Sequence, residues 1–350
     1  MIAVKVVDRQ GQCATFSAES GQRLLQAGLA AGVGLPHECA TGTCGSCKAT
    51  VVKGDVRRLW PEAPGAKALR SANETLLCQS AADGPVELSL RANFIPPYEP
   101  APRETKGELS LVRELTPEVA LFSIALHDPM AWQPGQFVLV SGLGIEGARG
   151  YSMTREVADP SRIDLLIRKD PSGRFSTALF DDLGRSHEVA VFGPLGRATF
   201  SCDEGRPFIA MAGGSGIAGI LAILDHAINS GHFSKHQSKL FFGLRDAATS
   251  YLLDEISAAV AASQNNLAVT VAFSNEACGP EFAARYPNIN FVDGFVHDVV
   301  RAAMQSGAVP ADSNPIFFVA GPPVMVNATM RMLVTECKVS PAEIRYDRFG

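Results

Sequence analysis

The pattern of hydrophobic and polar positions changes twice along the chain and thereby predicts three kinds of structure. In residues 1–91, IAVKVV and CATFSA alternate around the turn DRQGQ, which predicts a hairpin. The stretch QRLLQAGLAAGV has helical apolar spacing, and KATVV and VELSLRA are strand candidates. These elements predict a small α+β domain.

Residues 107–203 consist mostly of short strand candidates separated by Gly/Pro turns, which favours an antiparallel β-barrel. The strand candidates are LSLVREL, VALFSIAL, FVLVSG, RIDLLIR and EVAVFG, and only TALFDDLG has helical spacing.

From residue 204 to 350 strand and helix candidates alternate, which predicts an α/β domain with a parallel sheet and helices on both faces. The pairs begin with PFIAMA and IAGILAILDHAI, continue with KLFFGL and SYLLDEISAAVAA, and end with PIFFVAG and VMVNATMRMLV.

The segment 92–106 is the best candidate for a linker. It belongs to the stretch ANFIPPYEPAPRETKG, with prolines at 96, 97, 100 and 102, which favour extended polyproline geometry over a helix or a central strand. The predicted domains are therefore residues 1–91, 107–203 and 204–350.

Composition and charge narrow the class of protein. The chain has 350 residues, 46% hydrophobic and 19% charged, which suits two or three globular domains. It shows neither a signal peptide nor an 18-residue apolar run, so we expect a cytoplasmic protein without a membrane span. The net charge of -5 argues against a nucleic-acid partner. Residues 1–91 carry 10 Lys/Arg and 8 Asp/Glu, so the first domain is weakly basic.

The stretch CATGTCGSC places Cys39, Cys44 and Cys47 in a CxxxxCxxC pattern. Cysteines stay reduced in the cytoplasm, so a cluster of them favours metal over disulfides. Cys78, in LLCQS, can supply a fourth ligand. Zinc is the alternative, although structural zinc sites usually use two close pairs such as CxxC.

The spacing of these four cysteines resembles that of plant-type [2Fe-2S] ferredoxins. The resemblance implies a β-grasp ferredoxin domain in which Cys39 and Cys44 hold one iron and Cys47 and Cys78 the other. Gly42 would let backbone N–H groups approach the sulfurs.

A one-electron cluster cannot accept a hydride, so an NADH-driven protein needs a flavin between the two. The motif RGYSM, with PGQF shortly before it, resembles the flavin site of the ferredoxin reductase-like family. The resemblance implies that Arg149 pairs with a phosphate, that Tyr151 packs on the isoalloxazine and that Ser152 donates a hydrogen bond to the flavin N5.

The stretch IRKDPSGRFS supplies the second flavin motif. In the family, the GxxS formed here by Gly173 and Ser176 opens a helix whose N-terminal N–H groups take a pyrophosphate, which favours FAD over FMN. Arg168 and Lys169 could add positive charge there, or they could be a solvated strand end.

The stretch MAGGSGIAGI lies between a predicted strand and a predicted helix, as a nucleotide loop does. It formally contains GxGxxG, a dehydrogenase fingerprint, but it resembles more closely the AGGTGxxP loop of the ferredoxin reductase-like family, with Gly219 at the usual proline. Either interpretation predicts an NAD pyrophosphate on a helix N-terminus. The predicted contacts are Gly213, Gly214, Ser215 and Gly216.

Two later motifs extend this resemblance. FFGLRD brings Arg245 and Asp246 to the adenosine ribose, and VAGPPVMV places Gly321 and Pro322 near the nicotinamide, with Ala320 where the family usually has cysteine. A single base followed by Asp246 favours NADH over NADPH.

The chain ends in IRYDRFG. In relatives the C-terminal aromatic stacks on the flavin, so Phe349 joins Ser152 as a candidate catalytic residue. A docked core residue is the alternative for Phe349.

Together the motif sets resemble the reductase component of bacterial multicomponent oxygenases. The stretch GDVRRLWPEAPG is similar to reductases of toluene 4-monooxygenase and carbazole dioxygenase systems. The resemblance implies electron flow from NADH to FAD, through the [2Fe-2S] cluster, to a Rieske ferredoxin or directly to a terminal oxygenase. The alternatives are a reductase for a deoxysugar dehydratase and a metal-binding protein without enzyme activity. The weakly basic ferredoxin domain predicts an acidic partner.

Overall fold

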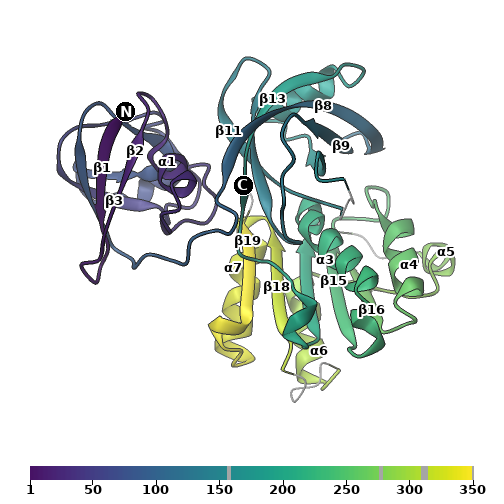
Figure 1. Cartoon of the computed structure of the whole chain (residues 1–350). Coiled ribbons are helices and arrows are strands. Elements are labelled where there is room, and N and C mark those ends of the chain that lie inside the picture. The colour runs from purple at the N-terminus through teal and green to yellow at the C-terminus, as the bar shows by residue number, and fades with distance from the viewer. Residues whose placement is uncertain (156–158, 276–278, 309–313, 349–350) are drawn as a thin grey trace. The chain divides into compact units, whose positions relative to one another are not determined.

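The computed structural model describes residues 1–155, 159–275, 279–308 and 314–348 (Figure 1). The chain divides into two compact units. The first comprises residues 1–106, 138–150 and 189–195, and the second comprises residues 107–137, 151–188 and 196–350.

The N-terminal segment is a five-stranded sheet with one helix. β1 (Ile2–Val7) and β2 (Cys13–Ala18) form the predicted antiparallel hairpin, with Ile2 opposite Ala18. β7 (Val86–Leu90) lies parallel to β1 and antiparallel to β3 (Lys48–Lys53), in the order β2-β1-β7-β3-β5. The other elements are α1 (Leu24–Ala30), β4 (Val56–Arg58), the 3₁₀ turns η1 (Pro64–Ala68) and η2 (Leu77–Gln79), β5 (Glu74–Leu76) and β6 (Ser80–Ala82). This arrangement confirms the predicted β-grasp domain.

Six strands follow in the next part of the chain. In the second unit, β9 (Val119–Leu126) pairs antiparallel with β8 (Arg103–Thr116) and with β12 (Arg162–Arg168). β10 (Phe137–Gly142), most of which belongs to the first unit, lies between β11 (Ile145–Ser152) and β13 (His187–Leu195). Among the described residues of this part, the one α-helix is α2 (Arg174–Asp181). The antiparallel strands agree with the predicted fold class.

The C-terminal part is a six-stranded parallel sheet in the order β17-β16-β15-β14-β18-β19. The strands are β14 (Phe208–Gly213), β15 (Ser238–Leu244), β16 (Leu267–Phe273), β17 (Ile289–Asp293), β18 (Ile316–Gly321) and β19 (Ile344–Arg348). The helices are α3 (Ile217–Asn229), α4 (Leu253–Ala262), α5 (Pro280–Arg285), α6 (Val296–Gln305) and α7 (Pro323–Arg331), which a π turn extends over Met332–Glu336. Short 3₁₀ turns cover Cys202–Glu204 (η3), Gly214–Gly216 (η4), His232–Ser234 (η5) and Pro341–Glu343 (η8).

Both faces of this sheet are buried by helices, as predicted. Successive side chains of a strand point to opposite faces. Accordingly Phe208 and Ala210 of β14 join a core cluster with α3 and α4, whereas Ile209 and Met211 join a second cluster with α6 and α7. The strand order reverses at β14, with β15 on one side and β18 on the other, and this is where ligands bind in open α/β sheets.

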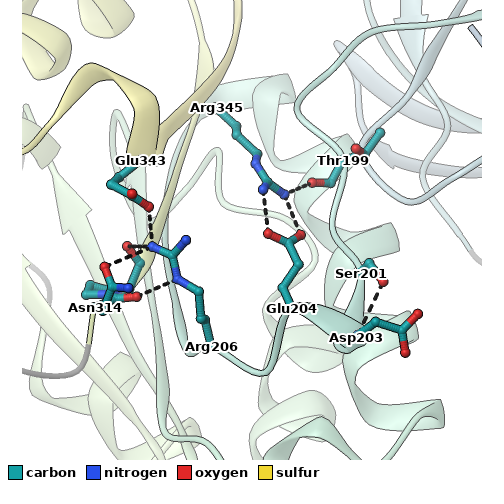
Figure 2. Close-up of polar contacts among 9 residues, drawn as sticks. Thr199, Ser201, Asp203, Glu204, Arg206, Asn314, Glu343 and Arg345 are labelled. Atoms are coloured by element: carbon teal, nitrogen blue, oxygen red, sulfur yellow. Dashed lines mark hydrogen bonds and ion pairs between the residues drawn. The ribbon is translucent and has the colours of Figure 1, made fainter. Parts of the chain in front are cut away.

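The edge strand β19 is held at its start by two arginine clusters (Figure 2). Arg345 donates to both carboxylate oxygens of Glu204, at 2.7 and 2.5 Å, and to the carbonyl of Thr199. Arg206 donates to the Asn314 carbonyl at 2.8 Å and to the carboxylate of Glu343. These contacts join the last strand to the segment that precedes β14.

The structure adds elements that the sequence pattern did not predict. β11, β17, β19 and α5 are among them. β8 also begins at Arg103, so the last four residues of the predicted linker are strand, because the prolines that exclude a strand end at Pro102. Within the described residues no helix is long and apolar enough to cross a membrane.

Candidate functional site

The four predicted cluster cysteines lie together as two pairs. The Sγ atoms of Cys47 and Cys78 are 3.2 Å apart, and the Cys44 amide lies 3.4 Å from the Cys39 Sγ. Cys47 and Cys78 are 2% and 1% exposed, whereas Cys39 and Cys44 are half-buried. The side of the site at Cys39 and Cys44 is therefore the one closer to solvent.

The thiols perturb one another as closely packed ligands do. The hydrogen bond with the Cys44 thiol lowers the pKa of Cys39 to about 3, and the same contact raises the pKa of Cys44. The hydrogen bond with Cys47, followed by burial, raises the pKa of Cys78. One thiolate in a pair thus disfavours ionisation of the neighbouring thiol. Bound iron would supply the positive charge that lets all four thiols ionise.

This arrangement suits a binuclear cluster better than a single zinc ion. A zinc site needs four ligands around one point. His37 is occupied elsewhere, since its Nδ1 lies 2.8 Å from the Leu35 carbonyl and its Nε2 lies 3.1 Å from the Tyr98 hydroxyl. The donor set fits the predicted [2Fe-2S] cluster.

Glycines shape the cluster loop. Gly42 has a φ of 95° and Gly45 a φ of 80°, a region open to glycine. The loop turns its amides to the sulfurs, as the 3.5 Å from the Ser46 N to the Cys44 Sγ shows. Gly65 is a third requirement that the sequence pattern did not reveal, because a Cβ there would lie 2.8 Å from the Gly42 carbonyl oxygen and from the Gly45 amide.

The predicted flavin motif RGYSM lies on β11 and just beyond it. Arg149 donates to the carbonyls of Glu146 and Gly147. The Tyr151 ring lies 6.3 Å from the Phe175 ring between centroids, and Ser152 is buried. A Cβ on Gly219 would meet the Ser152 Oγ at 3.6 Å, which is ordinary contact.

The second flavin motif, IRKDPSGRFS, forms a hydrogen-bonded turn before α2. Gly173 is the residue that precedes the helix, and the buried Ser176 hydroxyl accepts a hydrogen bond from the Asp170 amide at 3.0 Å. Lys169 pairs with Asp181 at 2.9 Å, and Arg168 pairs with Glu118 at 3.4 Å. These two charged side chains therefore have acidic partners in the protein.

A cavity of about 510 Å³ lies at the carboxyl edge of the parallel sheet. Gly213, Gly214, Arg245, Asp246 and Pro322 of the predicted nucleotide set line it, and so does Arg168. Gly216 packs against the end of β18, because a Cβ there would lie 2.4 Å from the Ala320 carbonyl oxygen. Ser215 is half-buried in η4, and Gly321 has a φ of 156° at the end of β18.

The negative charge of Asp246 favours binding of a ribose hydroxyl over a phosphate at this position of the cavity. Its carboxylate accepts from the Thr249 hydroxyl at 2.7 Å and from the Thr249 amide at 2.8 Å, and these hydrogen bonds lower its pKa. Asp246 is therefore ionised at neutral pH, which suits acceptance from a hydroxyl and opposes a second phosphate.

Other residues of the cavity were not predicted. Glu118, Tyr251 and Phe295 line it. Tyr251 is 8% exposed, and its hydroxyl finds no hydrogen-bond partner among the described residues. No spacing rule marks such residues, since they come from a turn and from loops. Phe349, the other predicted catalytic residue, lies outside the described residues.

Three family models match the chain in series: a 2Fe-2S iron-sulfur cluster binding domain over residues 7–83, an oxidoreductase FAD-binding domain over residues 106–200 and an oxidoreductase NAD-binding domain over residues 210–331. They confirm the predicted [2Fe-2S], FAD and NAD cofactors.

Similar proteins span the whole chain. The ferredoxin–NAD(+) reductase component of the alkene monooxygenase system of Xanthobacter autotrophicus is 32% identical over 96% of this chain and 98% of its own. The ferredoxin–NAD(P)(+) reductase CarAd of Metapseudomonas resinovorans is 31% identical over 94% and 95%.

Solved structures agree with this result. The ferredoxin reductase in carbazole 1,9a-dioxygenase has a TM-score of 0.81 at 29% identity and covers 99% of this chain and 98% of that one. The Amycolatopsis cytochrome P450 reductase GcoB has a TM-score of 0.75 at 26% identity over 100% and 99%.

Proposed function

This chain belongs to the FAD- and [2Fe-2S]-containing, NAD-dependent reductase components of oxygenase systems, and from that membership we propose how its residues carry electrons and which protein receives them. The observation that carries the proposal is the order of three cofactor domains in a chain that its relatives match from end to end.

The cofactors divide the chemistry into two steps. NADH delivers two electrons as a hydride and a [2Fe-2S] cluster takes one at a time, so a bound FAD accepts the hydride and releases its electrons singly to the cluster.

The parallel-sheet domain holds NADH. Gly213, Gly214, Ser215 and Gly216, at the start of α3, would bind the pyrophosphate through backbone N–H groups, and Asp246 would accept a hydrogen bond from the adenosine ribose. Arg245 lies beside it at the same end of β15. Gly321 ends β18 and Pro322 follows it at the same edge, where the backbone could approach the nicotinamide closely.

The FAD-binding domain orients the flavin. Tyr151 would pack on the flavin ring, Ser152 would donate a hydrogen bond to the flavin N5, and Arg149 would bind a phosphate of the cofactor. Gly173 and Ser176 set the turn at the start of α2 for the pyrophosphate, and Arg168 and Lys169 are close to it in sequence. Phe349, which lies outside the described residues, would cover the flavin until nicotinamide binds.

The ferredoxin domain delivers the electrons. Cys39 and Cys44 bind the iron nearer the open side, and Cys47 and Cys78 bind the buried one. The acceptor is a ferredoxin, with the Rieske type as the first to test, or the terminal component of an oxygenase. The domain limits 1–91, 107–203 and 204–350, with the linker at 92–106, are part of the proposal, although the last four residues of that linker form the start of β8.

An anaerobic titration with NADH tests the route. We expect about three electron equivalents per chain, two on the flavin and one on the cluster, with the last appearing as an electron paramagnetic resonance signal. Dithionite, which reduces both groups without the nucleotide site, is the control. Uptake of only two equivalents from NADH with no paramagnetic resonance signal from the cluster, when dithionite delivers three equivalents and produces that signal, would contradict transfer from flavin to cluster.

A further inference from the structure

The segment of residues 53–70 packs against the loop that carries Cys39, Cys44 and Cys47. It is hydrogen-bonded both to this loop and to the backbone beside Cys78. The Gly65 amide donates to the Gly42 carbonyl at 2.8 Å, between Cys39 and Cys44. The Leu59 amide donates to the carbonyl of Gln79 at 2.8 Å, directly after Cys78. These two hydrogen bonds hold the segment in a defined position relative to the cluster cysteines.

Further contacts hold η1 in place. The Lys48 ammonium donates to the Ala68 carbonyl at 2.8 Å, and a Cβ on Gly45 would lie 2.9 Å from the Ala68 Cβ. η1 thus packs directly on the loop beside the half-buried Cys44. Because Cys47 and Cys78 are buried, a protein that takes an electron by the shortest path approaches from the Cys39 and Cys44 side and meets this segment.

The positive charge of the ferredoxin domain is concentrated in the same segment. Residues 53–70 hold five basic and two acidic side chains, net +3, whereas the rest of residues 1–91 holds five basic and six acidic, net -1. All seven of these side chains are exposed: Lys53, Asp55, Arg57, Arg58, Glu62, Lys67 and Arg70. Such a patch attracts an acidic surface and repels a basic one.

A large apolar side chain stands within this charged patch. Trp60 is 43% exposed, and its carbonyl accepts from the Ala63 amide at 3.2 Å, which fixes its backbone. Exposed tryptophan on a rigid backbone beside arginine is the composition typical of binding hot spots.

We propose that residues 53–70 are the docking surface for the electron-accepting protein, with Trp60 as its apolar anchor and Lys67 and Arg70 steering an acidic partner. The inference rests on the proposed function, since it names the surface through which the cluster passes electrons on.

Two haem proteins of opposite charge test the surface in the full-length holoenzyme: cytochrome b5, which is acidic, and cytochrome c, which is basic. At low salt the wild type should reduce cytochrome b5 the faster. Lys67→Glu should slow cytochrome b5 reduction about threefold and speed cytochrome c reduction, and both changes should fade at high salt. Arg9→Glu, an equal charge change at an exposed site outside the segment, should do neither.

The anchor is tested separately. Trp60→Ala should raise the KM for cytochrome b5 about tenfold at any salt concentration. Val52→Ala, which truncates a side chain 65% exposed in the same domain, should leave the KM unchanged. NADH-dependent reduction of ferricyanide should match the wild type in all variants, since it needs no docking surface.

These experiments distinguish a failure of the docking surface at residues 53–70 from a failure of the proposed electron path from NADH through FAD to the cluster. A wild type that prefers cytochrome c, or variants at Lys67 and Trp60 that match their controls, would overturn the docking surface while the NADH titration still stands. Slower reduction of both haem proteins by Lys67→Glu would also overturn it, because that result indicates damage to the cluster.

Discussion

At the scale of single residues, His232 stands out as a buried base. It is 4% exposed, and its ring stacks on those of His236 and Phe208, with centroids 4.8 and 5.6 Å apart. Burial first, and then the charges of His236 and His226, lower its pKa from 6.5 to about 4. The folded protein therefore keeps His232 neutral at pH values where an exposed histidine is charged.

This shift predicts a loss of stability in mild acid. Below pH 6.5 the unfolded chain binds a proton at His232 that the folded chain does not accept until about pH 4. The free energy of unfolding should therefore fall between these values, by up to about 3 kcal/mol from this group. His232→Phe keeps an aromatic ring and removes the proton site, so its urea midpoint should change less between pH 7 and pH 5. His127→Gln, at an exposed histidine, is the control. Parallel pH profiles for wild type and His232→Phe would contradict the prediction.

Single residues were predictable where chemistry fixes a spacing. The four cysteines follow from CxxxxCxxC and a later Cys78, because each ligand must be a thiol. Gly65 and Tyr251 were not predictable, since their importance arises from neighbours distant in sequence. Arg168 illustrates the same limit. Sequence places it beside the flavin motif, whereas the structure also places it on the wall of the nucleotide cavity.

At the scale of elements, β19 depends on polar contacts more than an inner strand does. It pairs only with β18 in the sheet, and Arg345 holds its start against Glu204 (Figure 2). Burial disfavours ionised Glu204, but the hydrogen bond and charge of Arg345 outweigh this and lower its pKa. The carboxylate is thus charged at neutral pH and paired with a guanidinium that is itself 27% exposed.

Glu204→Gln should loosen this edge. The amide keeps the shape but leaves the Arg345 charge unbalanced, which should cost about 1–3 kcal/mol locally. Hydrogen exchange of a peptide covering Ile344–Arg348 should become faster. Asp203→Asn removes the same charge from the exposed neighbouring residue and should leave that exchange rate unchanged. Equal rates for Glu204→Gln and wild type would show that strand pairing with β18 holds β19 without the ion pair.

Elements were predictable where their hydrophobic pattern is strong. β14 and β18 are continuous apolar runs, β15 contains the apolar run LFFGL, and α3 has a wide apolar face. β19 has the sequence IRYDR and β11 has IEGARGYS, so charges and glycines hide their strand character. Both segments are strands because they pair with neighbouring strands, although their own sequences lack a clear strand pattern.

At the scale of the whole molecule, the order of the domains was the most predictable feature. Each domain carries its own pattern of strands and helices and its own cofactor motif, so no long-range contact had to be inferred. The proline-rich stretch ending at Pro102 marks the first division. The division after β13 carries no such signal, because there the change is only from antiparallel strands to alternating strands and helices.

This modular order predicts that electron entry and electron exit can be separated by one substitution. Cys44→Ala removes a ligand at the half-buried side of the cluster site and should abolish cluster binding, while the FAD and NAD segments keep their own residues. NADH-dependent ferricyanide reduction should stay within about twofold of wild type, whereas cytochrome b5 reduction should fall more than about tenfold.

The matched control for this loss is Cys13→Ala. Cys13 is an exposed cysteine on β2 of the same domain, so its removal should preserve the cluster and both activities. Iron content and visible absorbance measure the cluster directly. If Cys44→Ala lost ferricyanide reduction together with iron, the flavin and nucleotide sites would depend on the ferredoxin domain for their own structure. If it lost iron but still reduced cytochrome b5 at the wild-type rate, electrons would leave from the flavin, and the cluster would not be the exit.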